Sequence, residues 1–255
     1  MNTDAVLHIA GMKFDLSIIA MIIVTSIISF ALVRMGSRKA TISNISTMQN
    51  FVEWIVEFVK DFIGTTMDEE KGRKFLVLGL TLIIYIFVGN MLEIPFMIIT
   101  KVTKPISMFG HKLVTASQIQ SATNHVVNVL WWKSPTADPA AAMALAVIVI
   151  VLAHYLGIRY NTKQYFKSYF SPYVFFFPFN VIEKLSNFLT LGMRLFGNIF
   201  AGEILITVIL MMGWLGTIPL VLWLGFSTFV GLIQAFIFAV LTMVYISMET
   251  SEEGH

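Results

Sequence analysis

Five charged side chains lie within or beside long apolar runs of this sequence, where charges are rare. They are Glu93, Glu183, Lys184, Arg194 and Glu203. A charge inside a membrane span is costly, and such charges commonly mark ion pathways and proton relays. Their chemistry would be ion transfer between carboxylates, past a guanidinium that stays charged. Lys184 also fits a simpler role, which is an ion pair or a headgroup contact near a helix end.

Arg194 belongs to a polar stripe on one helix face. At 100° per residue, five side chains point within about 40° of Arg194: Glu183, Asn187, Thr190, Asn198 and Ala201. No acidic residue lies three or four positions from Arg194, so a local salt bridge is excluded. The sequence therefore predicts a counter-charge from another helix, and it favours a carboxylate on another chain.

The acids divide by depth along this helix. Glu183 precedes Arg194 by 11 residues, or about 17 Å of helix axis. Glu203 follows Arg194 and points about 180° away, to the back of the helix. Glu93 lies near the far end of its own apolar run. This division suits two aqueous half-paths, one to each surface, with a cationic barrier between them.

The last apolar run carries a second stripe. Five side chains share one face: Ser227, Gly231, Gln234, Leu241 and Tyr245. A buried glutamine amide needs hydrogen-bond partners, and Arg194 or Asn198 across the helix pair would serve. Gln234 also fits a plainer role, in which it only joins two helices by a hydrogen bond.

The composition is that of a membrane protein. Of 255 residues, 57% are hydrophobic and 13% are charged, about half the charge fraction of soluble domains. The apolar runs do not alternate, which disfavours a β-barrel. The expected fold is an all-α polytopic membrane protein with five membrane-crossing helices, at residues 17–33, 75–99, 139–158, 179–213 and 218–248.

The fourth run is too long to cross a bilayer upright. Residues 179–213 are 35 residues without proline, or about 52 Å as a helix. The hydrocarbon core of a bilayer is only about 30 Å thick. We therefore expect the last two helices to be long and strongly tilted.

The remaining segments are more polar. Residues 48–63 predict an amphipathic helix in the membrane interface or on a partner. Residues 68–74 are expected to form a solvated turn, and 100–138 a polar outer loop. The absence of cysteine excludes disulfides and thiolate sites. No metal, no cofactor and no nucleic-acid partner are predicted, because ligand clusters and basic patches are missing.

Lysine and arginine counts predict the orientation. With the N-terminus outside, ten basic residues face inward, in the segments 34–74 and 159–167, and five face outward. The prediction is an N-terminus outside and a C-terminus in the cytoplasm. We expect a single membrane domain over 1–255, with an N-terminal part (1–74), a helical hairpin with its outer loop (75–170) and a tilted helix pair (171–250).

Two stretches resemble the a subunit of F-type ATP synthases in its bacterial form. They are LTLGMRLFGNIFAGE at 189–203 and LIQAFIFAVLTMVYISM at 232–248, and GNMLEIP at 89–95 is a weaker match. The resemblance covers roughly residues 75–250, and the first 74 residues agree in layout only. It implies a bacterial plasma-membrane stator beside a ring of c subunits, held by the b subunits of a peripheral stalk.

The resemblance also implies roles for individual residues. Arg194 matches the family's essential arginine, which exchanges with a ring carboxylate. The outer half-channel would comprise Glu93, Glu203 and Ser227, although some members carry histidine at the position of Ser227. The centre would be Asn198 and Gln234, and the inner half-channel would be Glu183 and Asn187. The carried ion, proton or sodium, stays open, because the family sets it mainly in the rotor.

Two other functions compete with this one. A self-contained proton-coupled transporter or channel would show internal repeats and broken helices, and the sequence shows neither. A membrane enzyme would use His111, His125 or His154, but no catalytic motif accompanies them. The chain is expected to have no active site of its own and to work as part of an ATP-synthesising complex.

Overall fold

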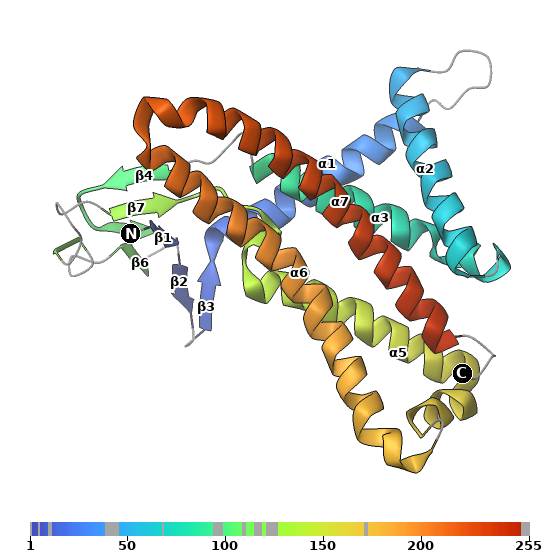
Figure 1. The fold of residues 1–255 in the computed structure, drawn as a ribbon. Coiled ribbons are helices and arrows are strands. Elements are labelled where there is room, and N and C mark those ends of the chain that lie inside the picture. The colour runs from blue at the N-terminus through green and yellow to red at the C-terminus, as the bar shows by residue number, and fades with distance from the viewer. Residues whose placement is uncertain are drawn as a thin grey trace.

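The computed structural model describes residues 2–4, 6–9, 12–38, 46–67, 69–93, 99–108, 111–114, 119–120, 127–170 and 173–250. In this part of the chain, five helices are long and apolar enough to cross a membrane: α1 (Leu16–Ser37), α3 (Glu69–Glu93), α5 (Pro139–Tyr169), α6 (Phe177–Met211) and α7 (Thr217–Thr250). The predicted polytopic helical fold is confirmed (Figure 1).

The amphipathic segment forms α2 (Thr47–Thr66), which is not among the five candidate spans. The Ser46 hydroxyl begins the helix by accepting a hydrogen bond from the amide of Gln49. Val59 and Phe62 are buried in the main core, whereas Trp54 is 61% exposed. The apolar face of α2 is therefore only partly covered by the rest of the chain.

Three helix boundaries differ from the sequence prediction. Residues 69–74 are the first turns of α3 and not a solvated turn, because glutamate, lysine and arginine are good helix formers. This helix is described to Glu93, and residue 99, the predicted end of the span, is the first residue of a strand; residues 94–98 of the predicted span lie outside the described residues. Helix α5 continues past residue 158 to Tyr169, and Tyr165 in this extension is buried.

The predicted long helix is continuous, and its bounds move by two residues. Helix α6 spans Phe177–Met211 rather than 179–213. Pro178 lies in its first turn, where a missing N–H costs nothing. The chain turns at Gly213, whose φ of 62° lies in the left-handed region that favours glycine. Helix α7 then runs back along α6.

Short strands lie where the sequence predicts polar segments. Strand β7 (Val127–Leu130) pairs with β1 (Asn2–Asp4) and β4 (Ile99–Val102). Two hairpins join β2 (Val6–Ile9) to β3 (Met12–Asp15) and β5 (Ile106–Met108) to β6 (His111–Val114). These strands gather at one end of the helices, which we call the strand end (Figure 1). Helix α7 ends at the opposite end, which we call the C-terminal end.

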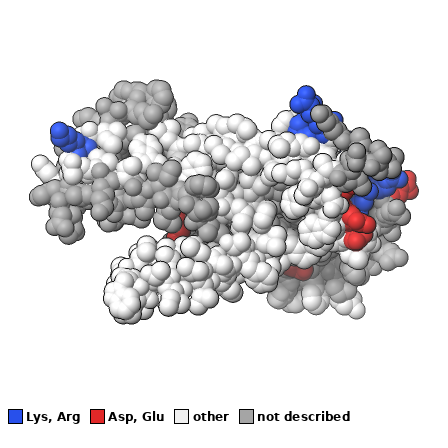
Figure 2. Space-filling model, turned by 90° about the horizontal axis from the view of Figure 1, so that it is seen from above, with Lys and Arg blue, Asp and Glu red and all other residues white. Residues whose placement is uncertain are grey.

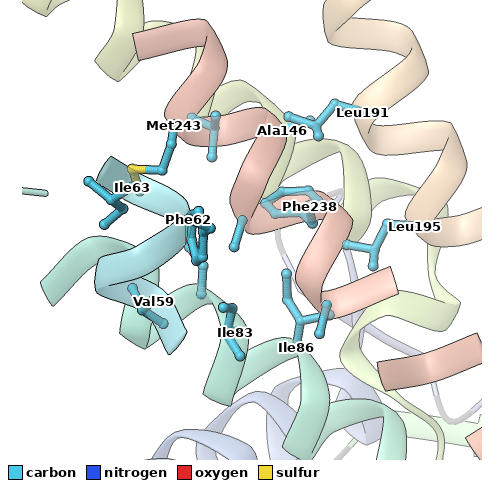
Figure 3. Close-up of a cluster of buried hydrophobic side chains, with 14 of the residues drawn as sticks. Val59, Phe62, Ile63, Ile83, Ile86, Ala146, Leu191, Leu195, Phe238 and Met243 are labelled. Atoms are coloured by element: carbon cyan, nitrogen blue, oxygen red, sulfur yellow. The ribbon is translucent and has the colours of Figure 1, made fainter. Parts of the chain in front are cut away.

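Helix α7 occupies the centre of the main core. Phe238 and Met243 on α7 are buried among side chains from four other helices (Figure 3), which are Val59 and Phe62 of α2, Ile83 and Ile86 of α3, Ala146 of α5, and Leu191 and Leu195 of α6. Small residues such as Ala146 let membrane helices approach closely, and van der Waals contacts then hold them.

On the face shown in Figure 2, charged side chains lie mainly at one end, and a smaller basic group lies at the other. A wide, nearly uncharged belt separates them. Such a belt matches the apolar core of a bilayer, which supports the assignment of the five spans.

We expect Phe238→Ala to lower the free energy of unfolding by about 3–5 kcal/mol, because it removes the aromatic contacts at the centre of the core. Phe238 is 1% exposed, whereas Phe226 on the same helix is 54% exposed. The matched control Phe226→Ala should therefore change little. Thermal unfolding of the purified chain in detergent, followed by circular dichroism, measures both. Equal midpoints for the two variants would contradict this packing.

Candidate functional site

Helix α6 has one packed face and one open face. Its buried residues are Leu191, Gly192, Leu195, Gly202 and Ile209. About 90° around the helix from these residues, Glu183, Thr190, Arg194 and Ala201 are exposed, and Asn187 and Asn198 are half-buried. The polar stripe of the sequence thus lies mostly on the exposed side of α6, which we call the open face.

Arg194 stands in the middle of this open face. In the described part of the chain, no carboxylate pairs with it and no hydrogen bond to it occurs. Its charge acts on the phenol of Tyr245, in the last third of α7. A phenol cannot neutralise a guanidinium, so Arg194 keeps its charge and its donors available on an exposed helix face.

Glu203 lies nearer the strand end and is held differently. Its Oε1 atom is buried and lacks a hydrogen-bond partner among the described residues. The neighbouring Gly202 packs against α7, where a Cβ on it would lie 3.9 Å from the Ser227 hydroxyl. Glu203 and Ser227 therefore belong to the same stretch of the α6–α7 pair.

Gln234 does not make the predicted contact. The residue is buried, and its Nε2 has no hydrogen-bond partner in the described part of the chain. The expected hydrogen bonds to Arg194 or Asn198 are absent, because Gln234 lies on the core side of α7 and Arg194 lies on the open side of α6.

A buried polar network next to Gln234 escaped the sequence analysis. Asn90 of α3 donates to the Gly231 carbonyl at 3.2 Å and accepts from the Thr136 hydroxyl at 3.1 Å. Thr136, in η2 (Pro135–Ala137), also bonds the Ser134 hydroxyl at 2.8 Å. Asn90, Ser134 and Thr136 are all buried. The sequence does hold one sign of this network. Asn90 lies inside an apolar run, and a buried asparagine needs hydrogen-bond partners.

The remaining predicted residues are placed in part. Glu93 is the last residue of α3, but its side chain lies outside the described part, as do those of His111 and His125. Glu183 and Asn187 lie on α6 towards the C-terminal end, on the other side of Arg194 from Glu203. No group of three potential metal ligands occurs among the described residues.

Fold and site together define a class of protein. It is a multi-pass membrane protein whose long helix pair α6–α7 exposes an arginine without an ion-pair partner among the described residues, between two sets of acidic and polar residues. The sequence matches the family described as ATP synthase A chain over residues 18–247, and the chain belongs to that family.

The similar proteins are bacterial and full-length. The chain is 44% identical over 251 residues to ATP synthase subunit a of Priestia megaterium, with 95% of each chain covered. It is 43% identical over 259 residues to the protein of that name from Bacillus subtilis, again with 95% of each chain covered. The protein of that name from Listeria welshimeri is 42% identical over 257 residues, or 97% of each chain.

We expect Asn90→Ala to lower the free energy of unfolding by about 1–3 kcal/mol, because it removes two buried hydrogen bonds, one to the Thr136 hydroxyl and one to the Gly231 carbonyl. Thr81→Ala is the control on the same helix, since the exposed Thr81 bonds only its own backbone, at Val77. Thermal unfolding in detergent compares them. A control that is as destabilised as Asn90→Ala would argue against the network.

Proposed function

We propose that this chain is the ion-translocating stator subunit of the membrane sector of an ATP synthase. The observation that carries the proposal is Arg194, exposed on the open face of a long apolar helix without a carboxylate partner in the described part of the chain. The family membership supports the same role. The counter-charge would be a carboxylate buried in each subunit of a rotating c ring.

The proposed chemistry at Arg194 is an exchange of partners. A charged arginine near the centre of a span costs at least ~2.5–3.5 kcal/mol, and an arriving ring carboxylate in its anionic form relieves that cost. The proton leaves the ring site for this reason as the site approaches Arg194. An arginine stays charged in proteins, so it cannot pass a proton itself and blocks direct leakage between the two half-channels.

Two half-channels would meet the ring on either side of Arg194. The outer one would use Glu93, Glu203 and Ser227, the centre Asn198 and Gln234, and the inner one Glu183 and Asn187. Three buried polar atoms without a hydrogen-bond partner in the described part of the chain support the outer route and the centre: Glu203 Oε1, Trp223 Nε1 and Gln234 Nε2. Buried polar atoms without protein partners call for water or an ion.

The proposed orientation places the C-terminal end in the cytoplasm of a bacterial cell. The basic residues Arg34, Arg159, Lys163 and Lys167 are at the ends of α1 and α5 opposite to the strands, where the positive-inside rule expects them. The N-terminus would then face outward. The open face of 171–250 would meet the c ring, and the b subunits of the peripheral stalk would bind elsewhere on the chain.

The first test is Arg194→Ala in the assembled ATP synthase. We expect ATP-driven proton pumping into inverted membrane vesicles to fall to background, because no other cation on this face of α6 can form an ion pair with the ring carboxylate. Arg159→Ala, at an exposed arginine of α5, is the control and should pump normally. Pumping by Arg194→Ala would overturn the proposal, and proton transport by the purified chain alone would favour a self-contained transporter.

The second test is Glu203→Gln. We expect passive and ATP-driven proton flux to fall about fivefold, equivalent to roughly 1 kcal/mol of barrier, because water and neighbouring polar groups replace the carboxylate only in part. Glu57→Gln on the exposed face of α2 is the control. Unchanged flux at every pH tested would remove Glu203 from the path.

A further inference from the structure

An ionic contact ties α6 to the last turn of α7 at the C-terminal end. The Lys184 ammonium donates a hydrogen bond to Glu249 Oε1. Both side chains are shielded from solvent, at 22% and 11% exposed. Lys184 points within about 20° of the buried Leu191 and Leu195, on the packed face of α6, whereas Glu183 lies on the open face.

Two tyrosines of α5 complete the contact. The Lys184 ammonium lies 4.7 Å from the ring centroid of Tyr169 and 5.6 Å from that of Tyr165, within the range of cation–π attraction. The two hydroxyls share a hydrogen bond of 2.9 Å. Burial, and then this bond, raise the pKa of Tyr169 above its ordinary value. The Tyr169 ring therefore stays neutral at physiological pH.

The same corner brings α5 and α7 close together. A Cβ on Gly157 would lie 3.0 Å from the Glu249 carbonyl oxygen and 3.1 Å from its Cβ, so the two helices approach where only glycine fits. The His154 ring packs edge-on against Tyr165 at 5.9 Å. We call His154, Tyr165, Tyr169, Lys184 and Glu249 the corner cluster.

Few side chains in the first half of α6 are buried. Leu191 is the first buried residue of this helix, which begins at Phe177. Before Leu191, the contacts of α6 with its neighbours include the corner cluster, the stacking of Phe177 on Phe170 at 5.1 Å, and Asn180, whose side chain donates to the Tyr169 carbonyl at 2.9 Å.

We propose that Lys184 and Glu249 are positioning residues for ion transfer: their contact, stacked on Tyr169, fixes the inclination of the first half of α6 against α5 and α7. This inference rests on the proposed function, because the same stretch carries Glu183 and Asn187. A change in the inclination would move these two side chains relative to the ring without touching Arg194.

The two partners are not equivalent. If Lys184 is removed, Glu249 remains a shielded carboxylate beside His154 without a cation, which is the costly outcome. If Glu249 is neutralised, the ammonium still lies over the two tyrosine rings. Loss of Lys184 should therefore impair the positioning of α6, and with it ion transfer, more than loss of Glu249.

The test uses the whole ATP synthase in inverted vesicles and measures protons pumped per ATP hydrolysed, together with the amount of assembled complex. We expect Lys184→Met to lower the pumping ratio about fivefold and Glu249→Gln about twofold. Lys184→Arg should keep the wild-type ratio, since it retains charge and ring stacking. The double variant that exchanges the two charges, Lys184→Glu with Glu249→Lys, should have a higher pumping ratio than Lys184→Met. Lys163→Met, at an exposed lysine of α5, is the control.

Two results would overturn the inference. One is a wild-type ratio in Lys184→Met. The other is a loss of assembled complex in Lys184→Met and Glu249→Gln while the complexes that remain pump at the wild-type ratio, which would indicate a purely structural contact. Arg194→Ala, measured in parallel, separates the two proposals: pumping by that variant defeats the proposed function, whereas normal coupling in Lys184→Met with an inactive Arg194→Ala defeats only the positioning role.

Discussion

A guanidinium that stays charged cannot rest against lipid without a large cost, and this constraint organises the chain around Arg194. The described part of the chain offers it no anion, although Tyr245 lies within electrostatic reach. A fold that only needed stability would have paired this charge or replaced it with an apolar side chain. An exposed and unpaired arginine on α6 instead fits a surface that is completed by another chain.

The way α7 is packed explains how α6 can keep an open face. Helix α7 meets α2, α3, α5 and α6 in one core, so the stability of the bundle does not depend on covering both sides of α6. Close packing of small residues such as Ala142 and Ala146 gives van der Waals contact where no hydrophobic drive exists between helices. The face that carries Thr190 and Arg194 thereby stays exposed.

The sequence predicts the five spans and the polar stripe because both depend on local pattern, namely apolar length and the 100° helical period. It does not predict the strands: β1 pairs with β7 across more than a hundred residues, and the local pairs β2–β3 and β5–β6 lack a strong hydrophobic alternation. It also predicts hydrogen bonds for Gln234 that do not occur among the described residues, and it overlooks Thr136. Rotation of one helix against another decides such contacts, and a single sequence carries little signal of it.

Two cations ten residues apart on α6, Lys184 and Arg194, have different surroundings. Lys184 and Arg194 lie about 80° apart around the helix, which is enough to place one on the packed face and the other on the open face. Lys184 contacts Glu249 and two tyrosine rings, whereas Arg194 has no ion-pair partner in the described part of the chain. In the proposed function, the paired cation would hold the helix in place and leave the unpaired cation able to change partners without loosening its own support.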